Sequence, residues 1–350
     1  LCVKLAADHG FGSLRGFVNG VLRNIARNKD SIVFPDQEKD KRAYYSVMYS
    51  VPEELLEILE RDYDYETIDR ILASGDSDRP TAIRVNTEKI SVTAFSEKLR
   101  QNGITVERGS MNDTSLLISG YDYIRKVPGF FDGEFVVQDQ SSCLAVKAAG
   151  INEGDLVVDV CAAPGGKTMY AAMLTGSEGH VISRDLIDKK TELIEENIER
   201  LGLSNVTVQV HDAREFDEEL TGKADVVIAD LPCSGLGIMG RKNDIKYHVS
   251  MESVKELAQL QREILDTVCR YGNPGGNLVY STCTIDSIEN DENAVWFADT
   301  HDFSLCGIDD VVPEHGGERG FVTLHQGIDE CDGFFISKFR ADSNNQIGQE

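Results

Sequence analysis

The chain has 350 residues, 41% of them hydrophobic and 27% charged, a balance typical of a globular protein with two or three domains. No apolar run approaches the roughly 18 residues of a membrane span. The formal net charge of −25 argues against a nucleic-acid binder with a broadly basic surface, so any such surface must be a local patch. The chain starts at Leu1 without a basic segment followed by an apolar one. We therefore expect no signal peptide and a missing upstream segment.

The eight cysteines contain no Cys-x-x-Cys pair. We therefore expect no zinc or other metal site. In a chain of this length, they are typical of free thiols in a reducing compartment, which predicts a cytoplasmic protein.

The N-terminal half predicts a helical segment, a linker and a small domain. Residues 1–35 are mainly helical, with an apolar face that should pack on something, and the polar residues 36–50 form a linker. Residues 51–128 predict a small α+β domain, in which Arg84 and Asn86 share one face of a strand and are candidate RNA contacts.

From residue 129 to 340, strands alternate with helices, which predicts an α/β domain with a mostly parallel, doubly wound sheet. Residues 341–350 form a polar tail. The five predicted parallel strands cover residues 156–160, 180–183, 206–210, 225–229 and 277–280. A last helix near 289–299 and two further strands complete the sheet.

The turn after the first of these strands admits three interpretations. It consists of Cys161, Ala162, Ala163, Pro164, Gly165 and Gly166, followed by Lys167. A P-loop would need glycine at position 161, and a dinucleotide fingerprint would need a third glycine. The third interpretation is an S-adenosylmethionine (SAM) site, because small residues before a helix let a ligand approach the backbone.

All five parallel strands end in residues that can do chemistry, at the sheet edge where α/β proteins bind ligands. Asp185 follows the second strand and could bind ribose hydroxyls, and Asp212 follows the third and could accept from adenine. Asp230 and Cys233 follow the fourth strand, and Cys283 follows the fifth.

Two cysteines on neighbouring strand ends favour nucleophilic catalysis. A thiolate that adds to carbon 6 of a pyrimidine turns carbon 5 into a nucleophile for a methyl group, and Asp230 could supply a proton at N3. Ionising the thiol requires positive neighbours, for which Lys167, Arg241 and Lys246 are the candidates. Arg241 and Lys246 are also candidate RNA contacts.

Several motifs carry a family resemblance. Cys-Ala-Ala-Pro-Gly-Gly-Lys-Thr (161–168), Asp-Leu-Pro-Cys-Ser (230–234), Ser-Thr-Cys-Thr (281–284) with Glu289-Asn290, and Asp-Gly-Phe-Phe (332–335) resemble the Sun-type RNA cytosine-5 methyltransferases. Residues 84–87 and 137–139 also match. Leu14–Ile25 looks like the last helix of the NusB-like helical domain carried by members that act on small-subunit ribosomal RNA.

The resemblance implies a Rossmann-like, SAM-dependent methyltransferase domain, preceded by a small α+β RNA-binding domain and a remnant of the NusB-like domain. It implies that Cys283 is the nucleophile and that Cys233 assists breakdown of the covalent adduct. Residues 161–167, Asp185, Asp212 and Asp230 would contact SAM. The substrate would be one cytosine in small-subunit ribosomal RNA, and we expect a monomer.

Two alternatives stay open. A cytosine-5 methyltransferase acting on another RNA or on DNA is the first; in the DNA enzymes the cysteine of the Pro-Cys motif, here Cys233, is the nucleophile. The second is a non-catalytic ribosome-assembly factor that retains a SAM fold.

Overall fold

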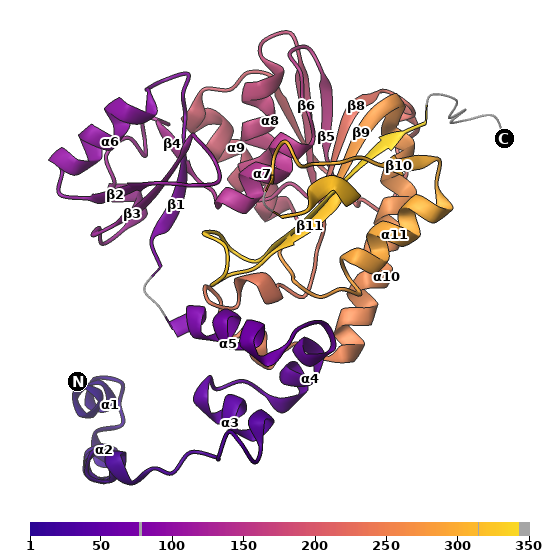
Figure 1. The fold of residues 1–350 in the computed structure, drawn as a ribbon. Coiled ribbons are helices and arrows are strands. Elements are labelled where there is room, and N and C mark those ends of the chain that lie inside the picture. The colour runs from indigo at the N-terminus through magenta and orange to yellow at the C-terminus, as the bar shows by residue number, and fades with distance from the viewer. Residues whose placement is uncertain (77–78, 314, 343–350) are drawn as a thin grey trace. The chain divides into compact units, whose positions relative to one another are not determined.

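The structure, a computed structural model, describes residues 1–76, 79–313 and 315–342 (Figure 1). It divides into two compact units, Leu1–Glu53 and Glu54–Glu350. The first unit contains the α-helices α1 (Cys2–Asp8), α2 (Arg15–Asn28) and α3 (Lys41–Met48). Helix α2 contacts α1, yet its apolar side chains Phe17 and Ile25 are 70% and 56% exposed.

Helix α3 falls inside the segment 36–50 that the sequence predicted as a linker, so that prediction is wrong for residues 41–48. Two local interactions explain the helix. The carboxylate of Asp40 accepts from the amide of Ala43 at 3.0 Å and caps the first turn. The rings of Tyr45 and Tyr49 lie 5.8 Å apart, one turn along the helix.

The second unit begins with α4 (Glu53–Asp62) and α5 (Tyr65–Ala73). Leu55, Leu56, Ile58 and Leu59 recur at helical spacing, and α4 buries all four. The turn between the helices ends at Asp64, whose side chain accepts from the amide of Thr67 at 2.8 Å and starts α5.

A four-stranded antiparallel sheet follows, with the strand order β2-β3-β1-β4 and helix α6 (Val92–Gln101) beside it. Its strands are β1 (Thr81–Val85), β2 (Thr105–Arg108), β3 (Ser115–Ser119) and β4 (Phe135–Val137). Because β4 pairs with β1, this domain extends past the boundary predicted at residue 128. Three residues are too few to show which strand β4 pairs with, which explains why the domain boundary was predicted too early in the chain.

The larger sheet has eight strands in the order β10-β12-β9-β8-β5-β6-β7, with β11 paired to β12. The five predicted parallel strands are confirmed, as β5 (Leu156–Asp159), β6 (His180–Asp185), β7 (Val206–Val210), β8 (Ala224–Asp230) and β9 (Gly272–Thr282). Strand β12 (Phe334–Ala341) runs antiparallel to β9.

Helices cover both faces of this sheet (Figure 1). On one face, α10 (Met251–Val268) and α11 (Asp291–Thr300) pack on strand residues such as Val158 and Val227. On the other face, α7 (Gln140–Ala148) and α8 (Gly166–Thr175) pack on the alternate residues Val157 and Val226. Helix α9 (Asp188–Leu201) packs on α8, through Ile194 and Met169. Burial on both faces accounts for the continuous apolar strands.

The C-terminal part of the sheet differs from the prediction in one strand. Where the sequence predicted two strands after α11, the structure has three, β10 (Phe303–Leu305), β11 (Phe321–Leu324) and β12. Strands β10 and β11 are short, and both pair with β12. Among the described residues, no helix is long and apolar enough to span a membrane.

Candidate active site

The turn between β5 and α8 joins two strand ends. Gly165 has φ +99°, a left-handed conformation that favours glycine, and a Cβ there would lie 2.9 Å from the Cε of Met169. The amide of Ala163 donates to Oδ2 of Asp185 at 3.2 Å, and the amide of Ile187 donates to Oδ1 at the same distance. Asp185 therefore fixes the turn to the end of β6.

The other two predicted carboxylates have different partners. Asp230 accepts from the Nζ of Lys167 at 2.6 Å and from the hydroxyl of Ser281 at 2.8 Å, so it links α8 to β9. Asp212 accepts from the Nη2 of Arg214 at 2.6 Å, and this hydrogen bond lowers the pKa of Asp212. An adenine amino group would have to share Asp212 with Arg214.

A cavity of about 220 Å³ brings several of the predicted residues together. Its lining includes residues 161–164, Gly166, Lys167, Asp230 and Cys283. A larger cavity of about 600 Å³ meets it at Val137, Pro164 and Gly166, but neither predicted cysteine lines that cavity. Cys283 lines the smaller cavity, so we take the smaller cavity as the candidate active site.

The two predicted cysteines lie side by side, with 3.4 Å between the Sγ atoms of Cys233 and Cys283. The hydrogen bond from Cys233 lowers the pKa of Cys283 against burial and the charge of Asp230, which raise it, and the positive charges of Lys167 and Lys242 act in the lowering direction. The same hydrogen bond raises the pKa of Cys233, as do burial and the charge of Glu289. Cys283 is therefore the thiol that ionises more readily.

Two glycines bring the loops around Cys283 into backbone contact. The amide of Gly237 donates to the carbonyl of Cys283 at 3.0 Å, and the amide of Gly333 donates to the carbonyl of Gly237 at 2.8 Å. A Cβ at Gly237 would lie 2.0 Å from the carbonyl oxygen of Gly333. The glycine of the Asp-Gly-Phe-Phe motif thus meets the loop that follows Cys233.

The structure does not place Arg84 and Asn86 at the surface, as the prediction of RNA contact required. Both are 1% exposed. The guanidinium of Arg84 donates to Oε1 of Gln138 at 2.7 Å and lies over the ring of Tyr170, and Asn86 donates to the carbonyl of Gly133 at 3.0 Å. We therefore correct this prediction: Arg84 packs the β1–β4 sheet on α8, and Asn86 joins the end of β1 to the loop before β4.

The two other predicted RNA contacts lie in the loop after Cys233. Arg241 forms an ion pair of 2.6 Å with Asp332. Lys246 is half-buried, and its Nζ lies 5.6 Å from the ring centre of Tyr247, which is 56% exposed.

Two residues that line the cavity, Asp159 and Ser142, were not singled out in the sequence, and Phe334 was noted only as part of the Asp-Gly-Phe-Phe motif. Burial raises the pKa of Asp159 to about 7, and its Oδ1 has no hydrogen-bond partner among the described residues. A carboxylate inside an otherwise apolar strand was the available signal. The ring centre of Phe334 lies 5.0 Å from the Nζ of Lys167.

Comparisons with known proteins find related methyltransferases. A probable ribosomal RNA small subunit methyltransferase B from Bacillus subtilis is 35% identical over 348 residues, which cover 97% of this chain and 76% of the relative. A crystal structure named PH0851 superimposes with a TM-score of 0.85 and 27% identity, covering 96% of this chain and 75% of that one. A methyltransferase homologue from Pyrococcus horikoshii has a TM-score of 0.73 and 26% identity, covering 85% of this chain and 97% of that one.

The fold and the site therefore define a SAM-dependent methyltransferase. The family model described as "16S rRNA methyltransferase RsmB/F" matches residues 147–340. The model of the ferredoxin-like domain of RsmF/B-like methyltransferases matches residues 51–122. The chain belongs to the RsmB/F family, which confirms the resemblance seen in its motifs.

The residues around the cavity fit SAM. The small side chains of residues 161–164 leave the backbone open, and the unpartnered Oδ1 of Asp159 can accept a hydrogen bond. Asp185 stands at the end of β6, where a ribose would bind.

Proposed function

We propose that this protein transfers a methyl group from SAM to carbon 5 of a cytosine in small-subunit ribosomal RNA, through a covalent bond between Cys283 and carbon 6. The thiol pair carries the proposal, because its Sγ atoms lie 3.4 Å apart and Cys283 lines the same cavity as Lys167 and Asp230. The family description and the relative from Bacillus subtilis, both named for ribosomal RNA, support the substrate.

The first step is attack by Cys283. Its ionised Sγ forms a bond to carbon 6, and the electron pair of the 5,6 double bond moves so that carbon 5 becomes nucleophilic. Asp230 takes a proton from the ammonium group of Lys167, whose Nζ lies 2.6 Å away, and passes it to N3. SAM supplies the electrophilic methyl group to carbon 5.

Release then reverses the covalent bond. Carbon 5 loses its hydrogen as a proton to water, the 5,6 double bond re-forms, N3 returns its proton through Asp230, and Cys283 leaves as a thiolate. Cys233, which keeps its proton because its pKa is raised, assists this breakdown next to Cys283. Residues 161–167, Asp185, Asp212 and Asp230 hold SAM in this proposal.

The competing assignment makes Cys233 the nucleophile, as in DNA cytosine-5 methyltransferases. Two observations favour Cys283. It lines the cavity, and its pKa is lowered where that of Cys233 is raised. A non-catalytic factor would need neither a lowered pKa nor the ion pair of Lys167 and Asp230.

The fate of the hydrogen on carbon 5 tests the proposal. Small-subunit ribosomal RNA transcribed with [5-³H]cytidine is incubated with SAM carrying a ¹⁴C-methyl group. We expect one tritium released to water for each methyl group incorporated, and no methylation of duplex DNA. Methyl incorporation without tritium release would place the methyl group on another atom and overturn the proposal.

Arg241 and Lys246 stay predicted RNA contacts. A cytoplasmic location is part of the same proposal, since ribosomal RNA is the substrate we infer. Light scattering of the purified protein tests the expected monomer.

A further inference from the structure

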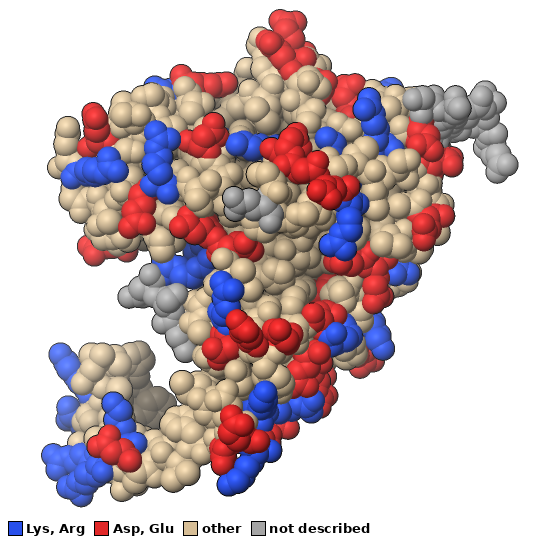
Figure 2. Space-filling model, in the orientation of Figure 1, with Lys and Arg blue, Asp and Glu red and all other residues tan. Residues whose placement is uncertain are grey.

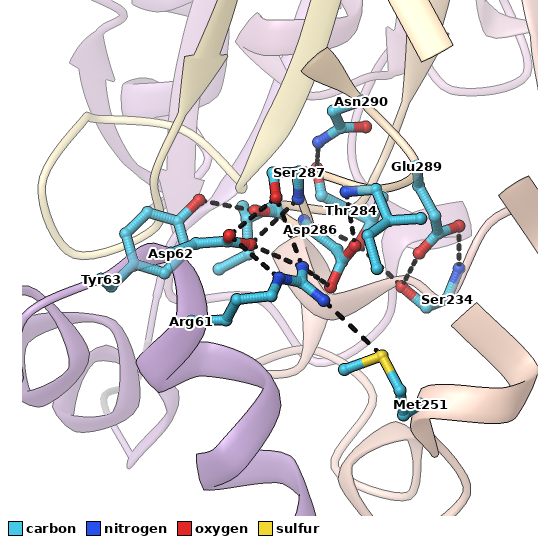
Figure 3. A network of polar contacts seen from close by, with 12 residues as sticks. Arg61, Asp62, Tyr63, Ser234, Met251, Thr284, Asp286, Ser287, Glu289 and Asn290 are labelled. Atoms are coloured by element: carbon cyan, nitrogen blue, oxygen red, sulfur yellow. Dashed lines mark hydrogen bonds and ion pairs between the residues drawn. The ribbon is translucent and has the colours of Figure 1, made fainter. Parts of the chain in front are cut away.

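A polar network is built from residues 284–290 and their neighbours, and it includes Ser234 and Thr284, which directly follow the two cysteines (Figure 3). Two adjacent side chains, Glu289 and Asn290, are 0% and 1% exposed. Neither of them lines the cavity of about 220 Å³, so neither is placed to touch a substrate there. Burying a carboxylate and an amide is costly unless specific partners satisfy them, and here each has partners next to one of the cysteines.

Glu289 binds the residue that follows Cys233. Its Oε2 accepts from the amide of Ser234 at 3.0 Å, and its Oε1 accepts from the hydroxyl of the same serine. The amide of Ser234 belongs to the peptide group that begins with the carbonyl of Cys233. By binding this amide, the carboxylate fixes the peptide plane beside Cys233. Gln261 donates to Oε2 at 2.9 Å and holds the carboxylate in turn.

Asn290 binds the residues on both sides of Cys283. Its Nδ2 donates to the carbonyl of Thr284 at 3.0 Å, and its Oδ1 accepts from the hydroxyl of Thr282 at 2.6 Å. One amide side chain therefore holds the side chain of the residue before the predicted nucleophile and the carbonyl of the residue after it. This arrangement limits how far the Sγ of Cys283 can move.

The two sets of contacts are joined to each other. The hydroxyls of Ser234 and Thr284 lie 2.7 Å apart, and these residues directly follow the two cysteines. Within the same segment, the Nη2 of Arg61 binds Asp286 at 2.7 Å, so an ion pair joins the end of α4 to residues 284–290 (Figure 3).

We propose that Glu289 and Asn290 are positioning residues with separate tasks: Glu289 orients Cys233 for adduct breakdown, and Asn290 orients Cys283 for attack. This inference rests on the proposed function. It predicts that losing one side chain impairs one half of the reaction. A role in stability alone would impair both halves together.

The experiment follows the RNA–protein adduct over time on denaturing gels, with small-subunit ribosomal RNA and SAM. For Glu289→Ala we expect the adduct to form at close to the wild-type rate and to break down roughly tenfold more slowly, as in Cys233→Ala. For Asn290→Ala we expect formation to slow by roughly tenfold, without accumulation.

Near-isosteric variants keep the test meaningful if an alanine variant folds poorly. Ser234→Ala removes one contact of Glu289 and should slow breakdown, whereas Thr282→Val removes one contact of Asn290 and should slow formation. Glu289→Gln should restore breakdown to within about threefold of wild type, because its carbonyl can accept from the Ser234 amide while its amide donates to the hydroxyl.

The outcomes separate this inference from the proposed function. If Cys233→Ala accumulates an adduct but neither Glu289→Ala nor Ser234→Ala does, the task of Glu289 is refuted. If Glu289 and Asn290 variants slow formation equally, the division of tasks is wrong. An adduct that persists in Cys283→Ala would instead overturn the proposed function.

Discussion

Asp159 is a buried carboxyl group whose charge opposes folding. Burial raises its pKa to about 7 from a usual value of 3.8, so the folded chain binds this proton more tightly than the unfolded chain. The stability that the protonated group contributes is complete below about pH 4 and is lost as the pH rises through about 7.

Asp159→Asn removes this dependence. In the absence of SAM, we expect the free energy of unfolding of the variant, minus that of wild type, to become more positive by roughly 2 to 3 kcal/mol between pH 5 and pH 9. Urea denaturation at several pH values measures it. The hydroxyl of Thr168 donates to Asp159 at 2.7 Å and lies 2.9 Å from the hydroxyl of Ser183. Ser183→Ala is therefore an uncharged change in the same network and should show a nearly constant difference. A constant difference for Asp159→Asn would contradict the assigned pKa.

At the level of single residues, the sequence predicted the site where topology alone brings side chains together. The carboxyl ends of parallel strands meet at one edge, so Asp230, Cys233 and Cys283 were expected there. Strand alternation also placed Arg84 and Asn86 on one face. Alternation does not say what covers that face. Here α8 covers Arg84, and Asn86 binds the carbonyl of Gly133. The contacts of Glu289 could not be predicted from the sequence, because they depend on the conformation of the loops that contain Ser234 and Glu289.

At the level of elements, the contact between the loop after Cys233 and the turn before β12 sets the position of Cys283. Gly237→Ala would bring a Cβ to 2.0 Å from the carbonyl oxygen of Gly333, and neither backbone can yield as a side chain can. We expect a loss of about 1 to 3 kcal/mol in the free energy of unfolding and a slower methyl transfer.

Gly272→Ala provides the matched control for that variant. A Cβ at Gly272, at the start of β9, would meet its nearest neighbour at 3.5 Å, an ordinary contact. Its unfolding free energy, measured by urea denaturation, should stay within about 0.5 kcal/mol of wild type. Equal effects of the two substitutions would show that the close approach is not required.

The elements themselves followed from the sequence where their patterns were long. The apolar runs of β5 to β9 and the helical spacing in α10 predicted the central sheet. They also predicted which polar residues follow each of its parallel strands. The pairing of β4 with β1 depended on contacts between segments far apart in the chain, and the third strand after α11 was missed because β10 and β11 are short. Short strands do not carry enough residues to specify such partners.

At the level of the whole molecule, the acidic charge bears on how RNA would be bound. On the face drawn in Figure 2, acidic and basic side chains are interspersed over the described residues. A net charge of −25 repels a polyanion, so binding must depend on local contacts near the cavity. This favours a substrate held partly by the covalent bond itself.

The most direct test of the account is therefore that bond. Wild type, Cys233→Ala and Cys283→Ala are each incubated with unmodified small-subunit ribosomal RNA and SAM, and separated on a denaturing gel. We expect an RNA–protein adduct that accumulates in Cys233→Ala, is scarce in wild type and is absent in Cys283→Ala. An adduct that is lost only in Cys233→Ala would exchange the roles of the two thiols, and would contradict the central claim that Cys283 is the nucleophile.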